Sequence, residues 1–185
     1  MRIILILLIP IFISSCGSGS SESETEGISP EPVPVVNIDP HQVGTLAREI
    51  VHDNIIRRFI LYVPDSYDRN TPTPLLFNFH GYGSNAEQQM NYGDFRSIAD
   101  NEGFLILHPQ GTRLPSTGST HFNVGGWTRG SNIDDVGFTN YLINVISRLY
   151  NIDELKIFST GMSNGGFMSY EPVSYTHLRA HETRG

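Results

Sequence analysis

The fold of this chain is decided by one stretch, residues 155–169, which reads LKIFSTGMSNGGFMS. Its opening, residues 155–158, is short and mostly apolar, which predicts a β-strand. Residues 166–168 read as the start of a helix. Between them lies Gly161-Met162-Ser163-Asn164-Gly165. The stretch therefore predicts a strand, a tight turn with a serine at its tip, and a helix.

Ser163 is a candidate nucleophile because the turn fits G-x-S-x-G in the setting that a nucleophile elbow requires. Glycines flank such a serine because a Cβ there would collide with neighbouring backbone. The N-terminus of the following helix also favours developing negative charge. The alternative is a glycine-rich turn with an incidental serine, and the strand and helix on either side argue against it.

A second motif, His80-Gly81-Tyr82-Gly83, follows the apolar run 75–79. Acyl transfer needs preorganised N–H donors for the oxyanion of the tetrahedral intermediate. We expect these donors to be the backbone N–H groups of Asn164 and Tyr82. We expect His80 to orient this loop rather than act as the base, because the acid and the histidine follow the serine in chain order in the fold that carries such an elbow.

The rest of the pattern alternates strands with helices, which predicts a mainly parallel sheet with helices on both faces. An antiparallel hairpin turning at Asp53-Asn54 is expected at its edge. The clearest helix follows Asp134-Asp135, and we interpret this pair as a helix cap rather than as catalytic acids. The expected strands are 47–52, 55–63, 75–79, 104–107 and 155–158, and the expected helices are 95–101, one beginning at 134–135 with an apolar stripe over 138–149, and one beginning near 166.

Composition excludes several functions. The net charge of −7 argues against nucleic acid as a partner, because phosphate binding needs clustered Lys and Arg. The one basic pair, Arg57-Arg58, is interpreted as the solvent-facing edge of a strand. No metal-ligand spacing and no dinucleotide fingerprint is present, so we expect no metal and no cofactor. Trp127 lies in the irregular segment 110–132 and either stacks on substrate or covers the core.

The N-terminus resembles a lipoprotein signal. A positive start and an apolar run, residues 3–13, are typical of a secretory signal. The run leads through Ser14 and Ser15 to Cys16, the single cysteine, in a pattern that resembles a bacterial lipobox. Acylation of Cys16 would anchor the chain to a membrane without spanning it. We expect an extracytoplasmic lipoprotein, periplasmic or on the cell surface, with residues 1–16 as signal and the acidic, proline-rich residues 17–43 as a disordered linker.

Over residues 56–170 the chain resembles the polyhydroxybutyrate depolymerase and feruloyl esterase family of secreted α/β-hydrolases. The resemblance rests on collinear stretches: 58–64, 74–83, 99–104, 108–109, 126–127, 134–138 and 161–169. It implies an α/β-hydrolase fold and ester hydrolysis through an acyl-enzyme on Ser163. It also implies polymeric substrates, either hydroxyalkanoate polyesters or phenolic esters of plant polysaccharide.

The chain departs from this family after residue 170. The family's acid and histidine lie well beyond the nucleophile, and Glu171, His177 and His181 are not assigned to those roles because so short a tail cannot cross the sheet twice. Residues 171–185 change abruptly in composition and resemble a translated sequencing adaptor. We therefore expect residues 44–170 to be the N-terminal part of a hydrolase domain, truncated after the nucleophile elbow. This polypeptide alone is expected to fold poorly and to be inactive.

The sequence and this resemblance thus predict a serine carboxylic-ester hydrolase with a Ser-His-Asp mechanism, similar either to a polyhydroxybutyrate depolymerase or to a feruloyl or acetyl-xylan esterase. Two alternatives remain: a serine peptidase of the same fold, and a catalytically inactive surface lipoprotein with a binding function.

Overall fold

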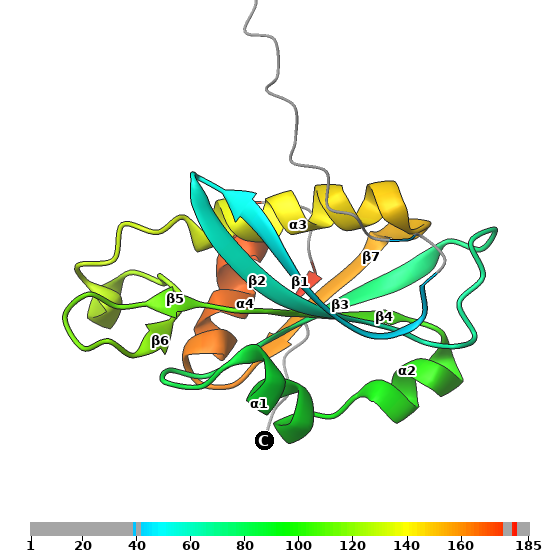
Figure 1. Ribbon diagram of the computed structural model, residues 1–185, viewed down its shortest axis with the longest axis horizontal. Helices are drawn as coiled ribbons and strands as arrows, with labels where there is room; N and C mark the ends of the chain where they lie inside the picture. Colours follow the sequence, from blue (N-terminus) through cyan, green and yellow to red (C-terminus); the bar gives the residue numbers. More distant parts are fainter. Residues whose placement is uncertain (1–38, 40–41, 176–178, 181–185) are drawn as a thin grey trace, which may run out of the picture. The chain divides into compact units, whose positions relative to one another are not determined.

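A six-stranded mixed sheet organises the part of the chain that the computed structural model describes, residues 39, 42–175 and 179–180. The strand order is β1-β2-β4-β3-β7-β8, and a separate two-stranded ribbon, β5-β6, lies outside this sheet (Figure 1). The strands are β1 (Gly44–His52), β2 (Ile55–Val63), β3 (Thr73–Phe79), β4 (Leu105–Pro109), β5 (Thr112–Arg113), β6 (Thr120–His121), β7 (Ile152–Gly161) and β8 (Arg179–Ala180).

The N-terminal hairpin forms at the expected turn and is the antiparallel edge of the sheet. β1 and β2 pair along their whole length, from Gly44 opposite Val63 to His52 opposite Ile55. Asp53 and Asn54 both have positive φ, 50° and 59°. Two positive φ angles define a type I′ turn, whose twist matches that of the flanking strands.

The central strands β4, β3 and β7 are parallel, as the alternating pattern predicted. Their carboxyl ends therefore meet at one edge of the sheet, which is where ligands bind in open α/β sheets. Phe79 is paired with Gly161 at this edge, so the loop after β3 and the turn after β7 start side by side.

Helices cover both faces of the sheet. On one side α3 (Asp135–Leu149) packs Phe138, Leu142 and Ile146 against the main core, and it contacts α4 (Asn164–Tyr175). On the other side lie the short helices α1 (Ala86–Tyr92) and α2 (Arg96–Glu102) (Figure 1). The apolar stripe over residues 138–149 is confirmed as the core-facing side of α3.

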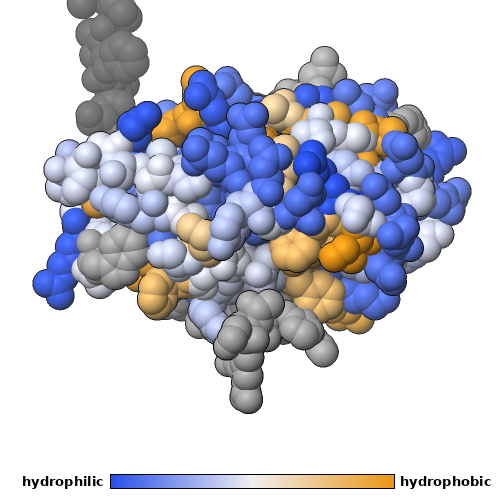
Figure 2. Space-filling view, turned by 90° about the horizontal axis from the view of Figure 1, so that it is seen from below, coloured by the Kyte–Doolittle hydropathy of each residue, from blue (hydrophilic) through white to orange (hydrophobic). Residues whose placement is uncertain are grey.

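The face that carries α1 and α2 is mostly hydrophilic, with hydrophobic residues gathered in patches (Figure 2). An apolar groove of about 440 Å³ lies on it, lined by Leu76 and Phe158 of the sheet and by Phe95 and Phe104 at the two ends of α2. None of the helices that the structure describes has the length and apolar character needed to cross a membrane.

The structure differs from the sequence-based expectation in several elements. Helix α1 was not predicted, since its seven residues, AEQQMNY, carry no apolar stripe. The segment 110–132, expected to be irregular, contains β5, β6 and a 3₁₀ turn, η1 (Gly126–Thr128). Helix α4 continues to Tyr175, so the boundary expected at residue 170 falls inside a helix.

Candidate active site

Ser163 occupies the tip of the turn between β7 and α4, as the G-x-S-x-G pattern predicted. Its φ of 52° places it in the left-handed region, which costs a residue with a Cβ about 1 kcal/mol or more. The residue is exposed, while Asn164 and Gly165 after it are buried. A strained, exposed serine between a strand and a helix has the geometry of a nucleophile elbow.

The flanking glycines are needed because the elbow lies directly on the end of β3. A Cβ on Gly161 would lie 2.5 Å from the carbonyl carbon of Gly165. A Cβ on Gly165 would lie 2.6 Å from the carbonyl oxygen of His80. Met162 N–H donates to the carbonyl of Phe79 at 3.1 Å, which ties the turn to that strand end. The glycines therefore allow a backbone approach that positions Ser163.

The loop after β3 borders the nucleophile. A Cβ built on Gly81 would lie 3.8 Å from the Cβ of Ser163 and 2.9 Å from the methyl group of Met162. Tyr82 comes next, with its side chain 37% exposed and its hydroxyl 2.6 Å from Thr117 Oγ1. The structure thus brings the two predicted loops together, and the backbone N–H groups of Asn164 and Tyr82 stay our predicted oxyanion donors.

Asn164 also has a role that its sequence position did not reveal. Its buried side-chain amide donates to the carbonyl of Phe122 at 3.0 Å, and its Oδ1 accepts the N–H of Phe122 at 2.7 Å. The side chain therefore pairs with both backbone groups of one residue, as a neighbouring strand would. No local signal predicts this contact, because Phe122 lies 42 residues earlier in the chain.

His80 is buried and its two ring nitrogens are committed. The N–H of Gly111 donates to Nε2 at 2.9 Å, so Nε2 is the unprotonated nitrogen and Nδ1–H donates to the carbonyl of Gly81 at 2.8 Å. Burial lowers the pKa of His80 below its ordinary value, which keeps the ring neutral. These contacts agree with the loop-orienting role expected for His80.

Comparisons with known proteins find relatives of this chain among esterases. The probable feruloyl esterase C of Aspergillus clavatus is 31% identical over 131 residues, covering 68% of this chain and 43% of the relative. The feruloyl esterase C of Emericella nidulans is 33% identical over 114 residues, covering 62% of this chain and 40% of the relative. A bifunctional acetylxylan esterase/xylanase of Neocallimastix patriciarum is 27% identical, covering 62% of this chain and 15% of the relative. No family model matches the chain.

Among solved structures, native pOPH superposes with a TM-score of 0.55 at 16% identity, covering 71% of this chain and 46% of its own. An S-formylglutathione hydrolase from Agrobacterium tumefaciens superposes with a TM-score of 0.51 at 18% identity, covering 72% and 53%. The chain has the α/β-hydrolase fold, and its relatives in sequence are carboxylic-ester hydrolases. It spans less than half the length of the curated relatives described above.

In this fold the interpretation of Arg57 as solvent-facing is wrong. Arg58 is exposed, but Arg57 is 1% exposed and forms an ion pair with Asp135, with 2.5 Å between Nη2 and Oδ1. Its guanidinium also lies over the ring of Phe138, 3.8 Å from the centroid. The strand period would have revealed this, since Arg57 shares its parity with Phe59 and Leu61, which are both buried.

The two aspartates before α3 have different roles. Asp134 is the helix N-cap and accepts the N–H of Gly137 at 2.7 Å, which confirms the predicted cap. Asp135 lies inside the first turn, and besides Arg57 it accepts the N–H of Asn123 at 2.7 Å through Oδ2. The sequence did not show that Asp134 caps the helix while Asp135 pairs with Arg57.

The structure also groups His52, Asp53 and Asp134, which offer ligand atoms within 4.8 Å of one another. The sequence did not predict this group. Both carboxylates are exposed, and Asp134 already caps α3.

The remaining predicted residues are not placed by the structure. The backbone of Trp127 belongs to η1, but its side chain lies outside the described part of the chain. Cys16, His177 and His181 lie outside the described residues altogether.

Proposed function

We propose that the whole protein is a serine carboxylic-ester hydrolase that forms an acyl-enzyme on Ser163. The observation that carries this proposal is the elbow: an exposed serine at a φ of 52°, with the loop after β3 close to its Cβ. Homology to feruloyl and acetylxylan esterases supports esters as the substrate class.

The first chemical step forms a bond between Ser163 Oγ and the ester carbonyl carbon, while a base takes the serine proton. The carbonyl oxygen becomes an oxyanion beside the N–H groups of Asn164 and Tyr82, and the N-terminus of α4 favours the same charge. The tetrahedral intermediate then breaks the bond to the alcohol oxygen, which leaves with a proton. Water hydrolyses the acyl-enzyme by the reverse sequence of steps.

The base and its carboxylate partner complete a Ser-His-Asp triad in this proposal. In this fold they follow the nucleophile in chain order. The described residues after Ser163 include no histidine, and His80 is committed to the oxyanion loop. We therefore place both groups after Ser163 and assign neither to a described residue.

A polymeric substrate with a polar backbone fits a cavity beside the loop that follows β3. This cavity has a volume of about 890 Å³, and its lining includes Ser84, Gln110, Thr112 and Thr120. Hydroxyl and amide groups of this kind hydrogen-bond to sugar hydroxyls. Esters carried by plant polysaccharide are therefore the substrates that we propose first, and hydroxyalkanoate polyesters are the second candidate.

The test is hydrolysis by the purified whole protein of nitrophenyl acetate, methyl ferulate and a hydroxybutyrate oligomer, each against the matching amide. Ser163→Ala should lower kcat roughly 10⁶-fold on the preferred ester. The matched control is Ser159→Ala, because the Ser159 hydroxyl donates to the carbonyl of Ser169 instead of facing the elbow. Faster cleavage of amides would indicate a peptidase, and unchanged activity in Ser163→Ala would exclude this nucleophile.

We also propose that Cys16 is acylated and anchors the enzyme to a membrane outside the cytoplasm. The support is the apolar run followed by Ser14, Ser15 and the only cysteine. A bacterial host fed a labelled fatty acid should label the wild-type protein, and Cys16→Ser should abolish the label and release the protein from the membrane fraction. Equal membrane binding by both forms would contradict the anchor.

A further inference from the structure

A buried ion pair lies next to the site without belonging to it. The side chains of Arg57 and Asp135 are 1% and 0% exposed. Burying such a pair gains little stability over well-packed apolar side chains, because desolvation offsets the attraction. The pair does fix the positions of its two side chains. Their remaining contacts show which backbone segments these side chains hold in place.

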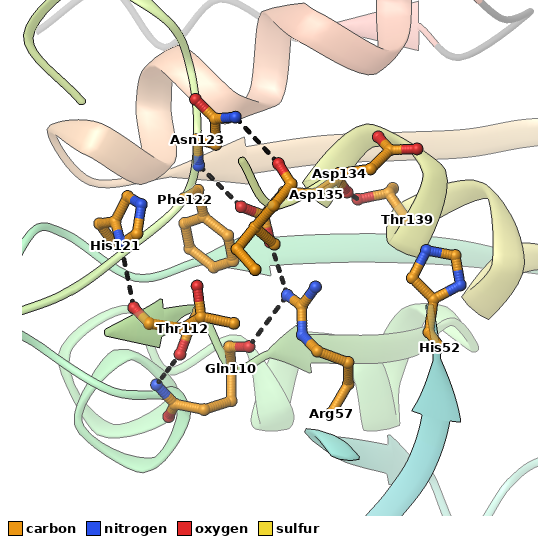
Figure 3. Close-up of polar contacts among 12 residues, drawn as sticks. His52, Arg57, Gln110, Thr112, His121, Phe122, Asn123, Asp134, Asp135 and Thr139 are labelled. Carbon is orange, nitrogen blue, oxygen red and sulfur yellow. Dashed lines mark hydrogen bonds and ion pairs between the residues drawn. The ribbon is translucent and has the colours of Figure 1, made fainter. Parts of the chain in front are cut away.

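From Asp135 the contacts lead to Asn164. The second carboxylate oxygen accepts the N–H of Asn123 at 2.7 Å (Figure 3). Phe122 precedes Asn123 in the chain, and its N–H and its carbonyl both hydrogen-bond to the side chain of Asn164. The carboxylate therefore fixes the segment against which the residue after the nucleophile is held.

From Arg57 the contacts lead to the loop after β3. Its guanidinium lies 3.4 Å from the carbonyl oxygen of Gln110 (Figure 3). The next residue, Gly111, donates its N–H to His80, and His80 in turn donates to the carbonyl of Gly81. The guanidinium therefore fixes the Gln110-Gly111 segment, which in turn holds the loop after β3 in place.

We propose that the Arg57–Asp135 pair positions the site: it holds the two oxyanion-donor segments, Asn164 and the Gly81-Tyr82 loop, at a fixed distance and orientation relative to each other. The inference rests on the function proposed above. Neither side chain contacts Ser163 in the structure, so each acts through the residues it holds. A displacement of about 1 Å of catalytic groups can cost on the order of 100-fold in rate, which is the effect that the pair prevents.

The first experiment compares Asp135→Leu, which removes both acceptor oxygens, with the double variant Asp135→Leu/Arg57→Met. The single variant leaves a buried charge without its partner, so it should lose both stability and kcat, the latter roughly 10- to 100-fold with KM within about 2-fold. The double variant removes the charge as well, so its melting temperature should recover. Its kcat should stay low, because the contacts to Asn123 and Gln110 are not restored.

Recovery of kcat together with melting temperature would show that the pair only stabilises the fold, and this result would overturn the proposal. An exposed ion pair elsewhere in the fold supplies a control. Lys156 Nζ lies 3.1 Å from Asp153 Oδ2 on the surface, so Lys156→Met should change neither kcat nor KM by more than about 2-fold.

A second measurement does not depend on activity. Amide hydrogen exchange in Asp135→Leu/Arg57→Met should accelerate about 10-fold or more both at Gly111, whose N–H donates to His80, and at Phe122, whose N–H donates to Asn164, because both segments lose their anchor. Leu142→Ala, a core variant of the same helix, provides a destabilised control in which these amides should keep their rank among the protected ones. Acceleration on one side only, or on neither, would overturn the proposal.

The two proposals fail in different ways. A wild-type protein that hydrolyses no ester would refute the proposed function, and amide exchange would then still decide the role of the ion pair. An active enzyme whose single variants keep full kcat would refute the positioning role and leave the esterase intact.

Discussion

At the scale of single residues, the site depends on how closely backbone can approach backbone. Ser163 takes a positive φ, and the glycines around it permit contacts that no other residue allows. The elbow could be predicted from sequence because this requirement is local: five consecutive residues carry it. The role of the Asn164 side chain could not, because its partner comes from a distant loop.

Gly165→Ala tests the local requirement. The added Cβ would lie 2.6 Å from the carbonyl oxygen of His80, so the elbow must move away from β3. We expect a loss of about 2 kcal/mol in the free energy of unfolding, in the range of overpacked cores, together with a lower kcat. Urea denaturation followed by circular dichroism measures the first effect.

The control is Gly166→Ala, one position further along α4. Its Cβ would meet the carbonyl oxygen of Gly161 at 3.3 Å, a tight but tolerable contact, and alanine favours a helix by about 1 kcal/mol over glycine. This variant should be close to wild type in stability. Equal losses at the two positions would contradict the claim that the approach of Gly165 to β3 is what requires glycine.

At the scale of elements, strands and helices with a regular period were predictable and short or irregular ones were not. The hairpin at Asp53-Asn54, the buried strand β3 and helix α3 each follow from their own residues. Helix α1 and the β5-β6 ribbon do not, because their few residues are held by tertiary contacts such as Gly83 N–H to the carbonyl of Thr120 at 2.8 Å.

Arg57 shows where element-level reasoning went wrong. Two adjacent arginines were treated as one surface feature, although successive residues of a strand face opposite sides. The parity of Phe59 and Leu61 points Arg57 inward, and only the presence of Asp135, 78 residues later, makes that burial tolerable. The strand period predicts which face of the sheet a side chain is on. Its ion-pair partner can be identified only from the tertiary structure.

At the scale of the whole molecule, stability should depend on pH through a buried histidine. His108 in β4 is 1% exposed, and burial lowers its pKa from 6.5 to about 4. Between these two values the unfolded chain binds a proton that the folded protein does not. Stability is therefore complete above about pH 6.5 and is lost as the pH falls toward 4.

The expected loss over this window is on the order of 3 kcal/mol, from about 1.4 kcal/mol per pKa unit. Burial lowers the pKa of His80 as well, which adds to the loss with the same sign. Asp94, whose pKa the Arg96 side chain lowers to about 2, acts in a separate window below pH 3.8. Urea midpoints measured from pH 7.5 to pH 4.5 should therefore fall steadily with most of the change below pH 6.5.

His108→Gln separates proton binding from packing. At pH 7.5 the difference from wild type measures only the changed packing, because His108 is neutral there in both states. As the pH falls, the wild type must lose stability faster than the variant, so the gap between their free energies of unfolding should narrow. Parallel curves from pH 7.5 to pH 4.5 would mean that His108 takes up its proton equally well in the folded protein, and burial in β4 would then not be the source of the acid sensitivity.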